Sequence, residues 1–80
     1  MFDKHAREMF EEQLEMAKKW PACCRDQADI TLAYAQGMVC YALIRGDIDH
    51  VEYSRMNNTI KSVRLNLIAK EIREQRMAAA

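Results

Sequence analysis

The chain has 80 residues, of which 50% are hydrophobic and 30% charged, with only two glycines and one proline. These proportions argue against a disordered segment and against a loop-rich β protein, and they favour an all-α fold. Lys+Arg and Asp+Glu both total 12, so the average charge points to neither a nucleic-acid partner nor a membrane partner. Residues 1–80 are expected to form one domain, which buries only about 60% of the surface that its unfolded chain exposes. Association with a second copy or with another protein would therefore help to stabilise it.

The cysteine content and the N-terminal sequence indicate a cytoplasmic protein. Three cysteines cannot all pair within one chain, and two of them are neighbours, which form a disulfide only with strain. Reduced thiols fit a reducing compartment better than a disulfide scaffold. The N-terminus MFDKHAREMFEE has acidic residues where a signal peptide is apolar, and no run approaches 18 apolar residues. We therefore expect no membrane span and no secretion.

The first predicted element is an amphipathic helix over residues 3–19. Apolar residues recur there at steps of three and four, which is the spacing of one helix face. They are Phe2, Ala6, Met9, Phe10, Leu14, Ala17 and Trp20. Asp3 is a suitable N-cap, and Pro21 forces Trp20 out of helical geometry and ends the helix. Trp20 is expected to fill the corner that follows.

The second predicted helix covers residues 22–45 and is apolar on almost every face. A helix of this kind is typically a central one, packed against neighbours on more than one side. Gly37 costs about 1 kcal/mol relative to alanine inside a helix, so its presence needs a reason. Together with Ala33, four residues earlier, it leaves a smooth patch that another helix could approach closely.

The stretch RGDIDHVEYSRM predicts a tight, capped hairpin between the second and third helices. Gly46 suits the left-handed residue that closes a helix. Asp49 and Glu52 have the spacing of a capping box, and Ile48 and Tyr53 have that of a hydrophobic staple.

The third predicted helix covers residues 50–76 and carries a seam of apolar residues. The seam steps by 3, 4, 3 and 4 residues, as in a coiled coil. Its members are Tyr53, Met56, Ile60, Val63 and Leu67. The last residues, REQRMAAA, are expected to fray.

These patterns predict a dimeric helical bundle. Aromatic and methionine side chains exceed what one 80-residue core can hide, and two copies that pack their central helices would bury them. The residues expected at the interface are Ala33, Tyr34, Gly37, Met38, Tyr41, Ile60, Val63 and Leu67.

Cys23 and Cys24 are the main candidates for chemistry. They stand at a predicted helix start beside Arg25, where the helix dipole favours a thiolate, so a redox-sensing thiol is one hypothesis. The competing interpretation is that one cysteine packs as a small apolar residue while the other faces solvent. The chain has no CxxC, HxxxH or CxxxH spacing and no nucleophile–base neighbourhood. We therefore expect no metal, no cofactor and no enzyme activity.

Nucleic-acid binding is the alternative function that the charge pattern suggests. Residues 54–80 carry six basic and two acidic side chains, and Arg64, Lys70 and Arg73 would be the contacts. The zero total charge and the interruption of the basic run by Glu71 and Glu74 argue against it. Basic residues near a helix C-terminus also simply complement the dipole.

The segment ALIRGDIDHVEYSRMNNTI resembles the short helical hairpins of small bacterial and phage proteins, in which a glycine, an isoleucine, a cap and a Glu-Tyr pair open the second helix. In its size, methionine content and helical plan, the whole chain is similar to small accessory proteins encoded in the early regions of lambdoid temperate phages. The resemblance implies a bacterial cytoplasm and a regulatory or adaptor role exerted by binding a host or phage protein. It brings no catalytic motif.

Overall fold

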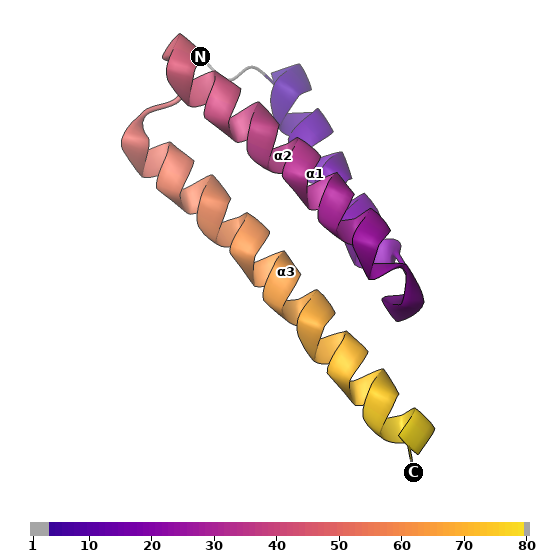
Figure 1. The fold of residues 1–80 in the computed structure, drawn as a ribbon. Coiled ribbons are helices and arrows are strands. Elements are labelled where there is room, and N and C mark those ends of the chain that lie inside the picture. The colour runs from indigo at the N-terminus through magenta and orange to yellow at the C-terminus, as the bar shows by residue number, and fades with distance from the viewer. Residues whose placement is uncertain (1–3, 80) are drawn as a thin grey trace.

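The computed structural model describes residues 4–79, and the secondary structure of this part of the chain consists of helices, with no strand (Figure 1). The elements are α1 (Lys4–Lys19), a 3₁₀ turn η1 (Ala22–Cys24), α2 (Arg25–Arg45) and α3 (His50–Ala79). The all-α prediction with three helices is confirmed. Helix α3 continues to Ala79 rather than ending near residue 76, since its last residues include alanines, the strongest helix formers. The N-cap predicted at Asp3 lies outside the described residues.

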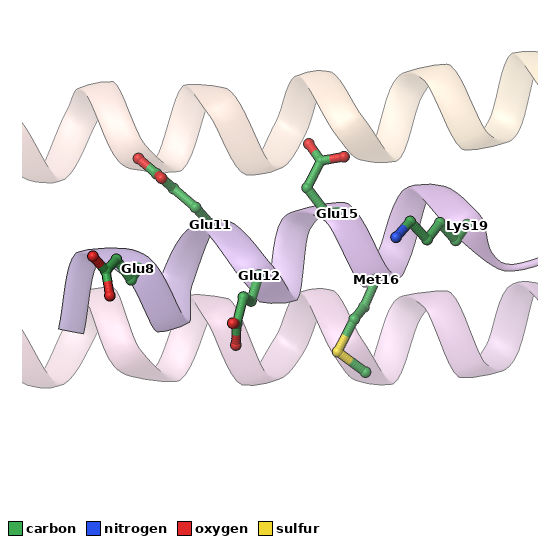
Figure 2. Close-up of a pocket in the computed structure, with 6 residues that line it drawn as sticks. All are labelled: Glu8, Glu11, Glu12, Glu15, Met16 and Lys19. Atoms are coloured by element: carbon green, nitrogen blue, oxygen red, sulfur yellow. The ribbon is translucent and has the colours of Figure 1, made fainter. Parts of the chain in front are cut away.

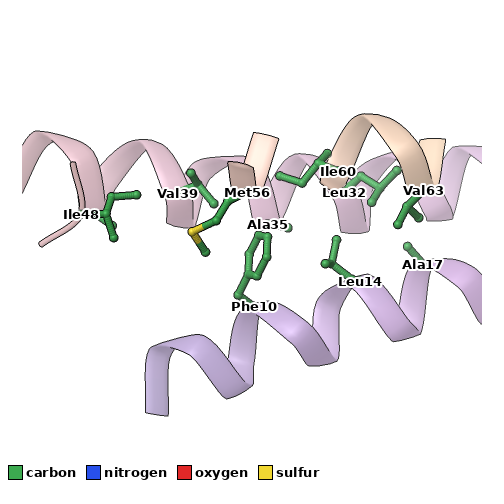
Figure 3. Close-up of a cluster of buried hydrophobic side chains, with 11 residues drawn as sticks. Phe10, Leu14, Ala17, Leu32, Ala35, Val39, Ile48, Met56, Ile60 and Val63 are labelled. Atoms are coloured by element: carbon green, nitrogen blue, oxygen red, sulfur yellow. The ribbon is translucent and has the colours of Figure 1, made fainter. Parts of the chain in front are cut away.

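Helix α2 is the element against which the other two pack. It contacts both α1 and α3, whereas α1 and α3 make fewer contacts with each other. One core joins the three helices (Figure 3), and its largest fully buried side chains are Leu32, Val39 and Ile60. Helix α1 contributes Phe10, Leu14 and Ala17, as its amphipathic pattern predicts.

The corner between α1 and α2 forms around the only proline. Helix α1 ends at Lys19, and Pro21 is extended, with ψ 155°. The Cys24 N–H donates to the Pro21 carbonyl at 2.9 Å, which closes the 3₁₀ turn. Trp20 is half-buried here, and its indole Nε1 is buried without a hydrogen-bond partner.

The turn between α2 and α3 is closed by backbone hydrogen bonds. Gly46 has φ 77°, the left-handed conformation that glycine adopts without strain. The N–H groups of Gly46 and Asp47 donate to the carbonyls of Leu43 and Ala42, at 3.0 and 2.9 Å. On the α3 side, the Asp49 carboxylate accepts from the Glu52 N–H at 2.8 Å. The Glu52 carboxylate accepts hydrogen bonds from the Arg7 and Arg55 guanidinium groups.

Two ion pairs between residues far apart in the sequence connect the helices, one near each end of the bundle. Near the turn, Arg7 Nη1 lies 3.2 Å from Glu52 Oε1 and joins α1 to α3. Near the corner, Arg25 Nη1 lies 2.8 Å from Glu71 Oε2 and joins the start of α2 to α3. The hydrogen bond to Glu71 raises the pKa of Arg25, against a smaller opposing effect of burial. The turns of α3 beyond Glu71 extend past the α1–α2 corner (Figure 1).

The molecule is elongated for its size. Its extents are 50 × 20 × 16 Å and its radius of gyration is 14.3 Å, against about 12 Å for a compact domain of this length. Its accessible surface is 5750 Å², compared with about 5,000 Å² for a typical monomer of this mass. One copy therefore leaves more surface open than a compact globule would.

Candidate functional site: the outer face of α2

Helix α2 has two apolar faces, of which only one is covered. The covered face consists of Ala28, Leu32, Ala35, Val39 and Ala42, all buried. These residues follow one another at steps of three and four and therefore share one side of the helix. The opposite side points away from α1 and α3.

The outer α2 face is the set of exposed residues on that opposite side: Ile30, Ala33, Tyr34, Gly37, Tyr41 and Ile44. Ile44 is 82% exposed, Tyr34 65%, Ile30 62% and Tyr41 61%. No charged residue occurs between Asp29 and Arg45, so the outer face is uncharged along almost its whole length. A contiguous apolar strip of this kind is typical of an interaction surface.

Gly37 lies in the middle of the outer α2 face and has no role within one copy of the protein. Its backbone is not in the left-handed region, where only Gly46 lies among the described residues. A Cβ atom at Gly37 would meet no other atom within 4 Å. Glycine therefore weakens the helix here without relieving any contact inside the protomer.

Tyr41 and Arg45 mark the C-terminal end of the outer α2 face. The Arg45 guanidinium carbon lies 5.8 Å from the centre of the Tyr41 ring, within the range of a cation–π contact. Arg45 also lies 3.8 Å from the Asp47 carboxylate. The strip thus ends where the charged turn begins.

The predicted interface residues fall into two groups in the structure. Ala33, Tyr34, Gly37 and Tyr41 lie on the outer α2 face, and Met38 is half-buried against the core. Ile60, Val63 and Leu67 belong to the α3 seam: the first two are buried and the third packs on the core. These three residues fill the interior of a single copy and do not offer a surface to a second one.

The sequence interpretation missed Ile30 and Ile44. With Tyr34, Gly37 and Tyr41 they form the series 30, 34, 37, 41 and 44, which steps by 4, 3, 4 and 3. This is the same spacing that identified the α3 seam. It was hidden because α2 is apolar on its other faces as well.

The vicinal cysteines are the last two residues of η1, directly before α2. Cys23 is exposed, Cys24 is half-buried, and their Sγ atoms are 3.7 Å apart. The hydrogen bond with Cys23, followed by partial burial and the charge of Cys23, raises the pKa of Cys24. A raised pKa favours the protonated thiol, whereas the position at a helix start was expected to favour the thiolate. The third cysteine, Cys40, lies 3.8 Å from the Tyr53 hydroxyl, between α2 and α3.

Within residues 4–79, no three His, Cys, Asp or Glu side chains come together in a way that could hold a metal ion. A surface hollow of about 440 Å³ is lined entirely by α1 (Figure 2). Its lining residues are Glu8, Glu11, Glu12, Glu15, Met16 and Lys19. Because one helix supplies every lining side chain, the hollow has no opposing wall that could grip a ligand.

The three basic residues considered for nucleic-acid contact do not share one side of α3. Arg64 and Arg73 are nine residues apart, which at about 100° per residue sets them on opposite sides of a straight helix. Arg64 and Lys70 are half-buried, whereas Arg73 is exposed. Arg76, three residues after Arg73, is also exposed on the projecting end.

None of the helices in the described part of the chain combines the length and the apolar character needed to cross a membrane. Comparison with protein families, with curated proteins and with solved structures finds no match to this chain.

Proposed function

We propose that this protein is a small non-enzymatic regulator or adaptor that works by protein–protein binding, as a homodimer formed through the outer α2 face. The observation that carries the proposal is the exposure of Ile30, Tyr34, Tyr41 and Ile44 on one uncharged side of the central helix. Helix α2 is apolar all round, and a helix of this kind reaches its stable state only when all its sides are covered.

The size of the outer α2 face supports this proposal. Two tyrosines and two isoleucines, exposed by between 61% and 82%, stand within five helical turns. Covering them removes on the order of 600 Å² of surface per protomer, near the about 800 Å² per partner that is usual for a specific interface. At about 25 cal/mol per Å² of apolar surface, such burial contributes several kcal/mol to association before its costs are subtracted.

The resemblance of the hairpin segment to those of small bacterial and phage proteins, and of the whole chain to accessory proteins of lambdoid phages, supports a bacterial host or phage protein as the target of regulation. In this proposal the homodimer is the working form, and surfaces outside the dimer contact bind the target. No reaction or cofactor is part of the proposed function.

The proposal is tested by placing a charge on the outer α2 face. Tyr41→Glu alters a side chain that is 61% exposed, so the fold of one copy should survive. Size-exclusion chromatography with light scattering at micromolar concentration should give the mass of a dimer for the wild type and of a monomer for the variant. Leu65→Glu is the matched control, because Leu65 is 65% exposed on α3, outside the outer α2 face. A wild-type monomer, or equal effects of the two variants, would contradict the homodimer.

Nucleic-acid binding remains a second candidate, which the exposed pair Arg73 and Arg76 at the projecting end of α3 favours. Phosphate contacts make such binding strongly dependent on salt. Replacing Arg64, Lys70 and Arg73 by alanine, which leaves only Arg76 at the projecting end, should then strongly reduce salt-sensitive retention on heparin. Unchanged retention in the triple variant would rule out these contacts.

A further inference from the structure

The residues of the outer α2 face are arranged almost symmetrically about Gly37. Ile30 and Ile44 lie seven residues before and after it. Ala33 and Tyr41 lie four residues before and after it. Tyr34 lies three residues before it, whereas the residue three after it, Cys40, is half-buried beside the Tyr53 hydroxyl and is not part of the outer α2 face. At four residues from the centre, a small side chain on one side corresponds to a tyrosine on the other.

From this arrangement we infer that the surface docks on a second copy of itself, with the two α2 helices antiparallel and crossing at Gly37. The inference rests on the proposed function and adds to it the orientation and register of the contact. In an antiparallel pair centred on Gly37, a residue before the centre meets the partner's residue at the same distance after it.

The antiparallel register fits the side-chain sizes. Ala33 lies beside the partner's Tyr41, so this large ring meets a small residue. Ile30 meets the partner's Ile44, which closes both ends of the contact with branched apolar side chains. Gly37 meets the partner's Gly37 at the crossing, where two backbones without Cβ atoms can approach closely.

A parallel pair fits the same residues poorly. It would set Tyr34 beside the partner's Tyr34 and Tyr41 beside the partner's Tyr41, one turn on either side of Gly37. Four rings would then hold the helices apart where glycine permits close approach. The antiparallel arrangement instead places the outward Gly37, whose added Cβ would meet no packed neighbour within 4 Å in one copy, where the two helices approach most closely.

The neighbouring elements leave room for this contact. Helices α1 and α3 both pack on the covered face of α2, where Leu32, Ala35 and Val39 are fully buried. The outer α2 face is on the opposite side, so a second α2 can lie along it without displacing either helix. In the resulting six-helix assembly both copies of α2 are central.

The register is tested by thiol cross-linking between two exposed positions. In a background with Cys23→Ser, Cys24→Ser and Cys40→Ala, one chain carries Ile30→Cys and a second chain, with a longer tag, carries Ile44→Cys. Both substitutions are at exposed sites, 62% and 82%, which preserves the core. The two variants are unfolded and refolded together so that mixed dimers form. A short thiol-specific cross-linker should then join an Ile30→Cys chain to an Ile44→Cys chain. It should not join two Ile30→Cys chains or two Ile44→Cys chains.

Each other outcome has a definite meaning. Cross-linking of each variant to itself would show a parallel pair and overturn the register while leaving the homodimer intact. If light scattering shows a dimer that is sensitive to Tyr41→Glu, but neither pairing cross-links, the antiparallel register is wrong and the proposed surface stands. If the Cys-depleted background is a monomer while the wild type is a dimer, Cys40 is restored and the same two pairings are compared. A monomeric wild type would overturn both the register and the homodimer.

Discussion

Gly37 is the residue whose substitution best separates a surface that faces water from one that contacts a second helix. In one copy an alanine at this position meets no atom within 4 Å, and alanine stabilises a helix interior by about 1 kcal/mol relative to glycine. At a close helix crossing the added methyl groups cost about 1–3 kcal/mol instead. We expect Gly37→Ala to weaken the dimer by about tenfold or more, measured by sedimentation equilibrium.

The same variant should show the opposite effect when the protein is dilute. Below the dissociation concentration, Gly37→Ala should unfold at a higher temperature than the wild type. Ser62→Ala is the control, because Ser62 is exposed on α3 and the change raises helix propensity away from the outer α2 face. Tighter association of the Gly37→Ala variant would show that no backbone approaches this position.

At Cys24 the structure predicts low rather than high thiol reactivity. Its pKa is raised, first by the hydrogen bond with Cys23, so less of the reactive thiolate is present at neutral pH than in an ordinary cysteine. Cys23→Ala removes this hydrogen bond and should therefore increase the rate at which iodoacetamide modifies Cys24 at pH 7, followed by mass spectrometry. Cys40→Ala in both proteins keeps the third cysteine out of the measurement. An unchanged or slower rate would show that Cys23 does not control Cys24.

At the scale of the helices, local patterns predicted most of the fold. The single-sided stripe of α1 and the 3-4 seam of α3 each specify a buried face, and Phe10 and Ile60 are buried accordingly. The α2 pattern could not be resolved in this way, because apolar residues on all sides do not say which side its neighbours cover. Contacts between distant segments, such as the ion pair of Arg7 with Glu52, could not be predicted from local patterns, because they depend on how the helices pack.

The start of α3 depends on a local contact that can be tested directly. The Asp49 carboxylate accepts the Glu52 N–H at 2.8 Å and so satisfies one of the unpaired donors of the first helical turn. Asp49→Ala should lower the free energy of unfolding by about 1 kcal/mol, or the melting temperature by about 4–8 °C for a chain of this size. Asp49→Ser, which keeps a capping oxygen, should recover most of the loss. Equal losses in both variants would assign the effect to something other than the cap.

At the scale of the whole molecule, the elongated shape and the large exposed surface have two structural sources. A radius of gyration of 14.3 Å and an accessible surface of 5750 Å² both exceed the values for a compact monomer. Part of the excess is the projecting end of α3, and part is the uncovered side of α2. Because α1, α2 and α3 supply only one shared core, the second side of α2 gains cover only from outside the protomer.

The stability of the whole molecule should therefore depend on its concentration. When unfolding separates two chains, each tenfold rise in protein concentration stabilises the folded dimer by about 1.4 kcal/mol. We expect the melting temperature of the wild type to rise steadily across a hundredfold range of concentration, as followed by circular dichroism at 222 nm. Tyr41→Glu should remove this dependence, because a monomer unfolds at a temperature that concentration does not change, whereas Leu65→Glu should retain it. A wild-type melting temperature that stays constant over the same range would mean that folding does not depend on association. The chain would then fold as a monomer with the outer α2 face exposed to solvent.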